Sequence, residues 1–169
     1  NYYDEQRFGI DKNNHLIGKY LVQKNFKQAC EILKFNVNKN NYIGALRTLS
    51  KRRLLFYIHS YQSFLFNKTL KTLKTKHKKI PLIGFLTEPK NKVIIKILKQ
   101  ENIKPRDFII KQMPELSSEG NERPMFVKVK DLKIKYQKDE LNPDKYKAIL
   151  NFSLPKGSYG TIVVKELFS

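Results

Sequence analysis

The strongest helical pattern in the chain is SKRRLLFYIHSYQSFLFNKTLKTL, which spans residues 50–73. Its apolar residues recur every three or four positions, as in a helix that packs one face against a core. The stripe consists of Leu54, Leu55, Ile58, Tyr61, Phe64 and Leu65. Arg52 and Arg53 stand near the start of the segment, where positive charge opposes the helix dipole. These two arginines therefore have either a further role or a salt-bridge partner nearby.

Weaker helical patterns flank this segment on both sides. The spacing of apolar residues predicts helices over residues 18–34, 42–49, 92–101 and 105–112. Pro105 suits the first turn of the last of these, and Pro114 ends it. Residues 80–85 and 117–122 are expected to be loops.

The pattern becomes extended toward the C-terminus. Residues 125–129 and 132–136 alternate between apolar and polar side chains, and residues 148–154 do so as a half-buried strand would. Residues 159–168 are predicted to form a final helix with Ser158 as N-cap, although the β-branched run 161–164 would equally suit a strand. A helical middle between mixed ends predicts an α+β fold with an insert in its core.

Charge is the main signal in the composition. The chain has 34 Lys and Arg against 15 Asp and Glu, a formal net charge of +19, which favours a polyanionic partner such as nucleic acid. Most of the cations are Lys, and Asn and Ile are also abundant, so biased base composition explains part of this charge. No run of 18 apolar residues is present, which excludes a transmembrane helix.

General catalytic motifs are absent from the sequence, and so are clusters of metal ligands. The one Cys and the three widely spaced His residues give no zinc site, and no disulfide can form within the chain. At the N-terminus, Tyr2, Tyr3, Gln6, Arg7 and Phe8 combine aromatic, amide and guanidinium groups, which is typical of a site for unstacked bases. A short edge strand that packs its aromatic side chains explains the same residues. From the residues alone, the chain is a basic α+β domain that faces RNA.

Three segments resemble motifs of the TruD family of tRNA pseudouridine synthases, in its archaeal and eukaryotic branch. They are NYYDEQRFG at residues 1–9, Arg52-Arg53 with HSYQSFLFN at 59–67, and LPKGSYGT at 154–161 with Lys165-Glu166-Leu167. Weaker similarity occurs at residues 81–84 and 116–123. The three stronger segments follow the family order and span the chain.

This resemblance implies an enzyme that isomerises uridine to pseudouridine in tRNA, usually at position 13, in the cytoplasm and without a cofactor or metal. It also implies that residues 1–26 and 134–169 belong to the catalytic core, a mixed or antiparallel sheet with helices. Residues 27–133 would form the helical insertion domain of the family. The implied partner is tRNA, and no membrane is expected.

The resemblance also implies which residues bind RNA. Asn1 and Tyr3 match positions at the target nucleotide, Tyr159 matches an aromatic residue that stacks near the target base, and Gln6 and Arg7 match a pair placed on the site or on phosphate. The further candidates for RNA contact are Arg52, Arg53, Arg123 and Lys165. Asp4 stands where the family has Gly, and Lys165 where it has Arg. Asp4 would disturb its loop if that position requires positive φ.

The nucleophilic Asp of the family has no matching position in this chain. We expect it in an upstream half, in the same protein or in a separate chain, so the 169 residues alone should be inactive. The alternative is an RNA-binding accessory chain that has lost catalysis. A basic structural protein of a ribonucleoprotein is less favoured, because it predicts no ordered set of three motifs.

Overall fold

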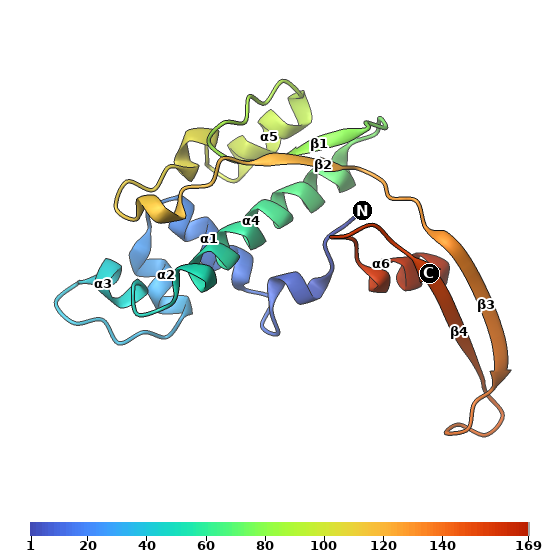
Figure 1. The fold of residues 1–169 in the computed structure, drawn as a ribbon. Helices are drawn as coiled ribbons and strands as arrows, with labels where there is room; N and C mark the ends of the chain where they lie inside the picture. The colour runs from blue at the N-terminus through green and yellow to red at the C-terminus, as the bar shows by residue number, and fades with distance from the viewer. Residues whose placement is uncertain (169) are drawn as a thin grey trace. The chain divides into compact units, whose positions relative to one another are not determined.

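The long helix α4, Lys51–Thr72, lies at the centre of the helical part of the molecule (Figure 1). Ser50 caps it, since its side chain accepts a hydrogen bond from the amide of Arg53 at 3.3 Å. Its apolar face is buried, with Ile58 and Tyr61 fully excluded from solvent. The predicted helix over residues 50–73 is therefore confirmed.

The computed structural model describes residues 1–168. In chain order, the elements before α4 are η1 (Glu5–Phe8), α1 (Asn14–Val22), α2 (Phe26–Ile32) and α3 (Tyr42–Leu46). Those after it are β1 (Lys79–Leu82), α5 (Lys92–Gln100), η2 (Pro105–Phe108), η3 (Pro114–Leu116), β2 (Asn121–Pro124), β3 (Lys130–Lys138), β4 (Tyr146–Ser153) and α6 (Gly160–Phe168). The predicted α+β fold class is confirmed.

The chain divides into two compact units. One is Tyr2–Met125, which we call the helical unit, and the other combines Asn1 with the chain from Phe126 onward, which we call the hairpin unit. The division of the chain into residues 1–26, 27–133 and 134–169 stays a prediction.

The predicted helix over residues 18–34 is two helices, α1 and α2. Lys24 adopts a left-handed conformation with φ of 60°, which ends the first helix. Asn25 then caps the second, because its side chain accepts a hydrogen bond from the amide of Gln28 at 3.3 Å. The apolar period runs across this break because both helices pack on the same core.

Three local predictions in the helical unit were wrong at least in part. The loop expected over 80–85 contains most of β1, and the loop expected over 117–122 runs into β2, with which β1 pairs antiparallel so that Ile80 lies opposite Arg123. The predicted helix over 105–112 is only the short 3-10 turn η2, because the chain becomes extended at Ile109. Proline is rare inside sheets, but Pro81 and Pro124 both lie in a two-stranded edge pair, where it is tolerated.

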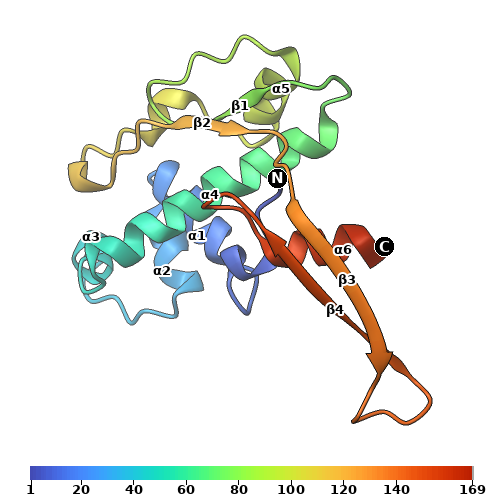
Figure 2. The ribbon, with the colours of Figure 1, turned by 45° about the vertical axis from the view of Figure 1, so that its right-hand side comes forward.

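The hairpin unit is built on β3 and β4, which pair antiparallel with Ile134 opposite Leu150. Figure 2 shows this hairpin with α6 beside it. The strand β4 confirms the prediction for residues 148–154, and α6 confirms the final helix. The segment 125–129, predicted to be extended, contains no strand of its own, and β3 begins at Lys130.

A buried carboxylate ties three helices of the helical unit together. Glu101, directly after α5, accepts a hydrogen bond from Lys19 of α1 at 2.8 Å and from Lys68 of α4 at 2.7 Å. Burial by itself raises the pKa of Glu101, but the two hydrogen bonds outweigh it and hold the pKa below its ordinary value. The ionised carboxylate is thus the form that the fold stabilises.

Two further features concern residues 1–168 as a whole. Within them no helix is both long and apolar enough to cross a membrane. The same residues contain no group of three or more His, Cys, Asp or Glu side chains arranged to hold a metal ion.

Candidate nucleic-acid interface

The N-terminal segment of the helical unit is held against α4 by its backbone. Asn67 accepts a hydrogen bond from the amide of Tyr3 at 2.9 Å and donates one to the carbonyl of Tyr3 at 2.8 Å. This pair mimics the contact that a neighbouring strand would make, so it fixes both the position and the direction of the chain at Tyr3.

Two serines of α4, one and two turns before Asn67, hold Arg7. The hydroxyl of Ser60 donates to the carbonyl of Arg7 at 3.0 Å, and the Nε of Arg7 donates to the hydroxyl of Ser63 at 3.2 Å. Ser63 in turn donates to the carbonyl of His59 at 2.7 Å. The bond at Nε fixes the plane of the guanidinium, and its terminal nitrogens keep their donors for other partners.

The Arg7 guanidinium is half-buried among aromatic rings. Its carbon lies 5.0 Å from the ring centre of Phe56 and 5.7 Å from that of Tyr3, within the range of cation–π contacts. Across the described part of the chain, no carboxylate comes within ion-pair distance of Arg7. A partly buried cation without a counter-charge is suited to an anion supplied by a ligand.

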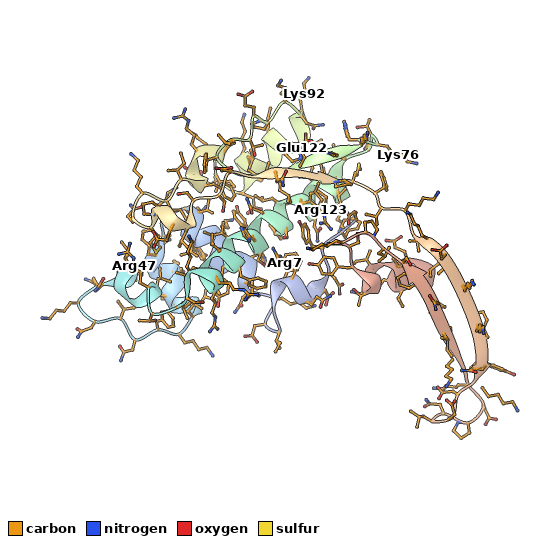
Figure 3. All side chains as sticks on the ribbon, in the orientation of Figure 1. Arg7, Arg47, Lys76, Lys92, Glu122 and Arg123 are labelled. Carbon is orange, nitrogen blue, oxygen red and sulfur yellow. The ribbon has the colours of Figure 1, made fainter. Side chains whose placement is uncertain are left out.

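Tyr3 packs between cations and an aromatic ring. The Arg123 guanidinium lies 4.1 Å from the centre of the Tyr3 ring and 5.5 Å from that of Phe66. The Tyr3 and Phe66 rings meet edge to face, with centres 5.6 Å apart. The strand β2 thus brings Arg123 to the same place as the N-terminal segment, and Figure 3 shows Arg7 and Arg123 both beside α4.

A cavity of about 510 Å³ opens beside Arg7, and we call it the Arg7 cavity. Its lining includes Tyr3, Arg7, Lys51, His59 and Gln62, together with Glu115 and the 117–121 segment. Gln62 is itself fixed, since it donates to the carbonyl of Ile83 at 2.7 Å. The volume lies within the usual range for small-molecule and nucleotide sites.

A second cavity of about 460 Å³ lies at the start of α4 and is lined by Ser50, Arg52, Arg53, Leu55, Phe56 and His59. We call it the Arg52 cavity. It shares Leu55 and His59 with the Arg7 cavity, so the two are neighbours on α4. Arg53 is oriented by a hydrogen bond from its Nε to the hydroxyl of Tyr57 at 3.1 Å.

The structure therefore brings together five of the nine predicted RNA-binding residues on one surface. They are Tyr3, Arg7, Arg52, Arg53 and Arg123. Gln6 also lies in the helical unit, but it is exposed on η1 and does not line either cavity.

The other three predicted residues, Asn1, Tyr159 and Lys165, belong to the hairpin unit. Tyr159 is half-buried directly before α6, and Lys165 is exposed on that helix. Asn1 and Tyr159, although they stand at opposite ends of the chain, are thus parts of the same compact unit.

Asp4 needs no unusual backbone conformation. Its φ is −82°, and the residue of this segment with positive φ is Gly9, at 84°. The carboxyl-bearing residue is buried, and its carbonyl accepts the amide of Arg7 at 3.0 Å. The concern that Asp in place of Gly would strain this loop is therefore removed.

Sequence reasoning missed the residues that hold the N-terminal segment. Ser60, Ser63 and Asn67 were recognised only as parts of a motif, without a role. Their spacing of three and four positions places them on one face of α4, and this polar stripe in an otherwise buried helix was the available signal.

The chain is similar to a known protein family and to several curated proteins. The family model of tRNA pseudouridine synthase D (TruD) matches residues 1–39 and 74–167. A protein of that name from Methanopyrus kandleri is 32% identical over 76% of this chain and 36% of its own length. Another, from Nanoarchaeum equitans, is 29% identical over 99% of this chain and 60% of its own length.

Among solved structures, that of tRNA pseudouridine synthase D from Methanosarcina mazei has the same fold, with a TM-score of 0.83 at 24% identity. The match covers 98% of this chain and 60% of that one. The chain thus spans between about a third and three fifths of the length of these relatives.

Proposed function

The chain belongs to the TruD family of tRNA pseudouridine synthases, and on that premise we propose that it forms the RNA-holding part of such an enzyme. The whole protein converts uridine to pseudouridine in tRNA, with position 13 as the expected target. The chain contributes the surface that binds the RNA strand around the target nucleotide.

The observation that carries this proposal is the uncompensated Arg7 guanidinium beside a cavity. Ser63 orients it, Phe56 and Tyr3 flank it, and Lys51 and His59 line the same cavity. A phosphodiester oxygen supplies the missing counter-charge, and an aromatic ring next to it supplies a face for a base. Phosphate, base and ribose are the three parts of the RNA that such a site must hold.

The chemistry requires that the target uridine leaves its stack, at a cost of a few kcal/mol. We assign the stacking that offsets this cost to Tyr159 and the contact with the target nucleotide to Asn1, both in the hairpin unit. A carboxylate then breaks the bond between the ribose and N1 of uracil, and the base is rejoined through C5. None of the Asp residues in this chain matches the family nucleophile, so we place that carboxylate outside these 169 residues.

The experiment is to measure pseudouridine formation in a tRNA transcript by the whole protein and by its Tyr159→Ala and Tyr159→Phe variants. Tyr159→Ala should reduce turnover at least about tenfold while the dissociation constant for tRNA changes little, because one base stack is worth about 1–3 kcal/mol. Tyr159→Phe should retain most of the activity, since the ring remains. If Tyr159→Ala formed pseudouridine at the parental rate, the stacking role would be wrong. Binding of tRNA without any pseudouridine would favour the accessory RNA-binding chain instead.

A further inference from the structure

Two lysine-rich segments of the helical unit contain no acidic residue. Residues 71–79 carry Lys71, Lys74, Lys76, Lys78 and Lys79, and residues 90–100 carry Lys90, Lys92, Lys96 and Lys99. All nine lysines are exposed. Because cations gather here without interspersed carboxylates, local composition is more strongly basic than in the chain as a whole.

The lysines of α5 lie on one face of the helix. Lys92, Lys96 and Lys99 are four and three positions apart, the spacing that aligns side chains, while Ile94, Ile97 and Leu98 point into the core. The row is about 10 Å long at 1.5 Å per residue. In the described residues none of these three ammonium groups has a carboxylate within ion-pair distance.

A cavity of about 450 Å³ joins the two lysine segments, and we call it the Lys90 cavity. His77 and Lys79 line it from one segment, Lys90 and Asn91 from the other, and Ile80, Pro81 and Ile94 add apolar surface. Figure 3 shows Lys76 and Lys92 on the side of the molecule that carries β1 and β2.

The Lys90 cavity adjoins the Arg7 cavity. Glu119, Gly120 and Asn121 line both, so the two cavities are neighbours across these residues. Gly84 and Gly120 are in close contact at this boundary, and a Cβ on Gly84 would lie 2.1 Å from the amide nitrogen of Gly120. A strand bound in the Arg7 cavity therefore has Lys79 and Lys90, in the lining of the Lys90 cavity, on its next side.

Three acidic residues also line the Lys90 cavity, namely Glu88, Glu119 and Glu122. Glu122 lies 3.8 Å from Lys79, in an exposed ion pair that contributes little. These acidic residues make the inside of the cavity poorly suited to a phosphate, whereas Lys92, Lys96 and Lys99 outside it have no carboxylate within ion-pair distance in the described residues. Carboxylates can accept hydrogen bonds from the amino groups of bases. A cavity with acidic residues beside lysines therefore suits a nucleic acid better than a simple anion.

We propose that residues 71–79 and the exposed face of α5 form a second RNA surface, which binds backbone phosphates of the strand that continues from the Arg7 cavity. This inference rests on the proposed function, because it takes RNA as the ligand of the first site. The second surface supplies affinity that depends on salt, and it takes no part in the reaction itself.

The test is the salt dependence of tRNA binding, measured with the triple variant Lys92→Gln, Lys96→Gln and Lys99→Gln. Gln has nearly the helix propensity of Lys, so α5 is preserved. The slope of log Kd against log salt should fall by about 2, at roughly 0.7 or more per phosphate contact, and Kd at low salt should rise at least about tenfold. In the whole protein, the turnover number at saturating tRNA should not change.

The matched control removes the same charge at the other end of α4, through Lys27→Gln, Lys34→Gln and Lys39→Gln. These three lysines are exposed, with Lys27 in α2, Lys34 just after it and Lys39 just before α3. Figures 1 and 2 show α2 and α3 near the start of α4, away from β1. An unchanged slope in the α5 variant, or an equal loss in the control, would overturn the second surface. Either result would leave the proposed function standing, because pseudouridine formation is read separately.

Discussion

Asn67 and Tyr3 exchange two hydrogen bonds across 64 residues of sequence, through the side-chain amide of one and the backbone of the other. This contact joins the first family motif to the motif on α4. An amide suits this position because its donor and its acceptor are separate atoms, so that each can bond one of the two backbone groups of Tyr3.

Replacing Asn67 by Ala should lower the free energy of unfolding by about 1–3 kcal/mol, since it removes both partners of a half-buried backbone. Hydrogen exchange at the amide of Tyr3 should become faster, because this amide loses the hydrogen bond to Asn67 that protects it. The control is Thr72→Ala, which removes only a hydrogen bond within α4, from Thr72 to the carbonyl of Lys68. If Asn67→Ala and Thr72→Ala lost the same stability, and hydrogen exchange at the Tyr3 amide did not change, the claim that Asn67 holds the N-terminal segment would be wrong.

Glu101→Gln should destabilise the chain at pH 7 by about 3 kcal/mol, because two partly buried ammonium groups lose their charged partner. The pKa of Glu101 is lower in the fold than its ordinary value, so its contribution is complete above about pH 4.5 and is lost as the pH falls through the folded value. The difference between parent and variant should therefore shrink on going from pH 7 to pH 3.

Urea unfolding at several pH values measures this difference. The exposed pair of Glu140 with Lys147 offers the control, and Glu140→Gln should change the free energy of unfolding far less at every pH. If the difference in free energy of unfolding between the parent and Glu101→Gln stayed constant down to pH 3, the ionised carboxylate would not be the stabilising form.

Gly84→Ala should destabilise the helical unit by more than about 2 kcal/mol. The added Cβ would lie 2.1 Å from the Gly120 nitrogen and 2.3 Å from the Glu119 carbonyl carbon, both backbone atoms that cannot rotate away. Gly160→Ala is the matched control, because its Cβ would meet only the Phe152 ring at an ordinary 3.6 Å. Thermal unfolding compares the two, and a Gly84 variant as stable as the Gly160 variant would exclude the close contact.

The helices of this fold could be predicted where the apolar period and the caps agree. Ser50 before α4 and Asn91 before α5 are residue types that favour the N-cap position, and each accepts a hydrogen bond from its helix. The break at Lys24 was not predictable from the apolar spacing, since a left-handed Lys is chosen by packing and not by propensity. The strands β1 and β2 were not predicted from the sequence, because each is short, contains a Pro and pairs only with the other.

The sequence indicated which residues belong to the candidate site better than it indicated how they are arranged. The resemblance identified Tyr3, Arg7 and Arg123, which the fold brings together at the rings of Tyr3 and Phe66. It gave no indication that Arg123 would cover Tyr3, because this contact depends on the β1–β2 pairing. Long-range contacts of this kind carry no local sequence signal.

The most direct test of the account is the binding of tRNA by Arg7→Ala over a range of salt concentrations. Arg106→Ala serves as control, because Arg106 is exposed on η2 and lines neither the Arg7 cavity nor the Arg52 cavity. If Arg7 binds a backbone phosphate, its loss should weaken binding at least about tenfold and lower the salt slope by roughly 0.7 to 1, while Arg106→Ala changes the slope far less. An unaltered affinity and slope for Arg7→Ala would contradict the assignment of this surface to RNA.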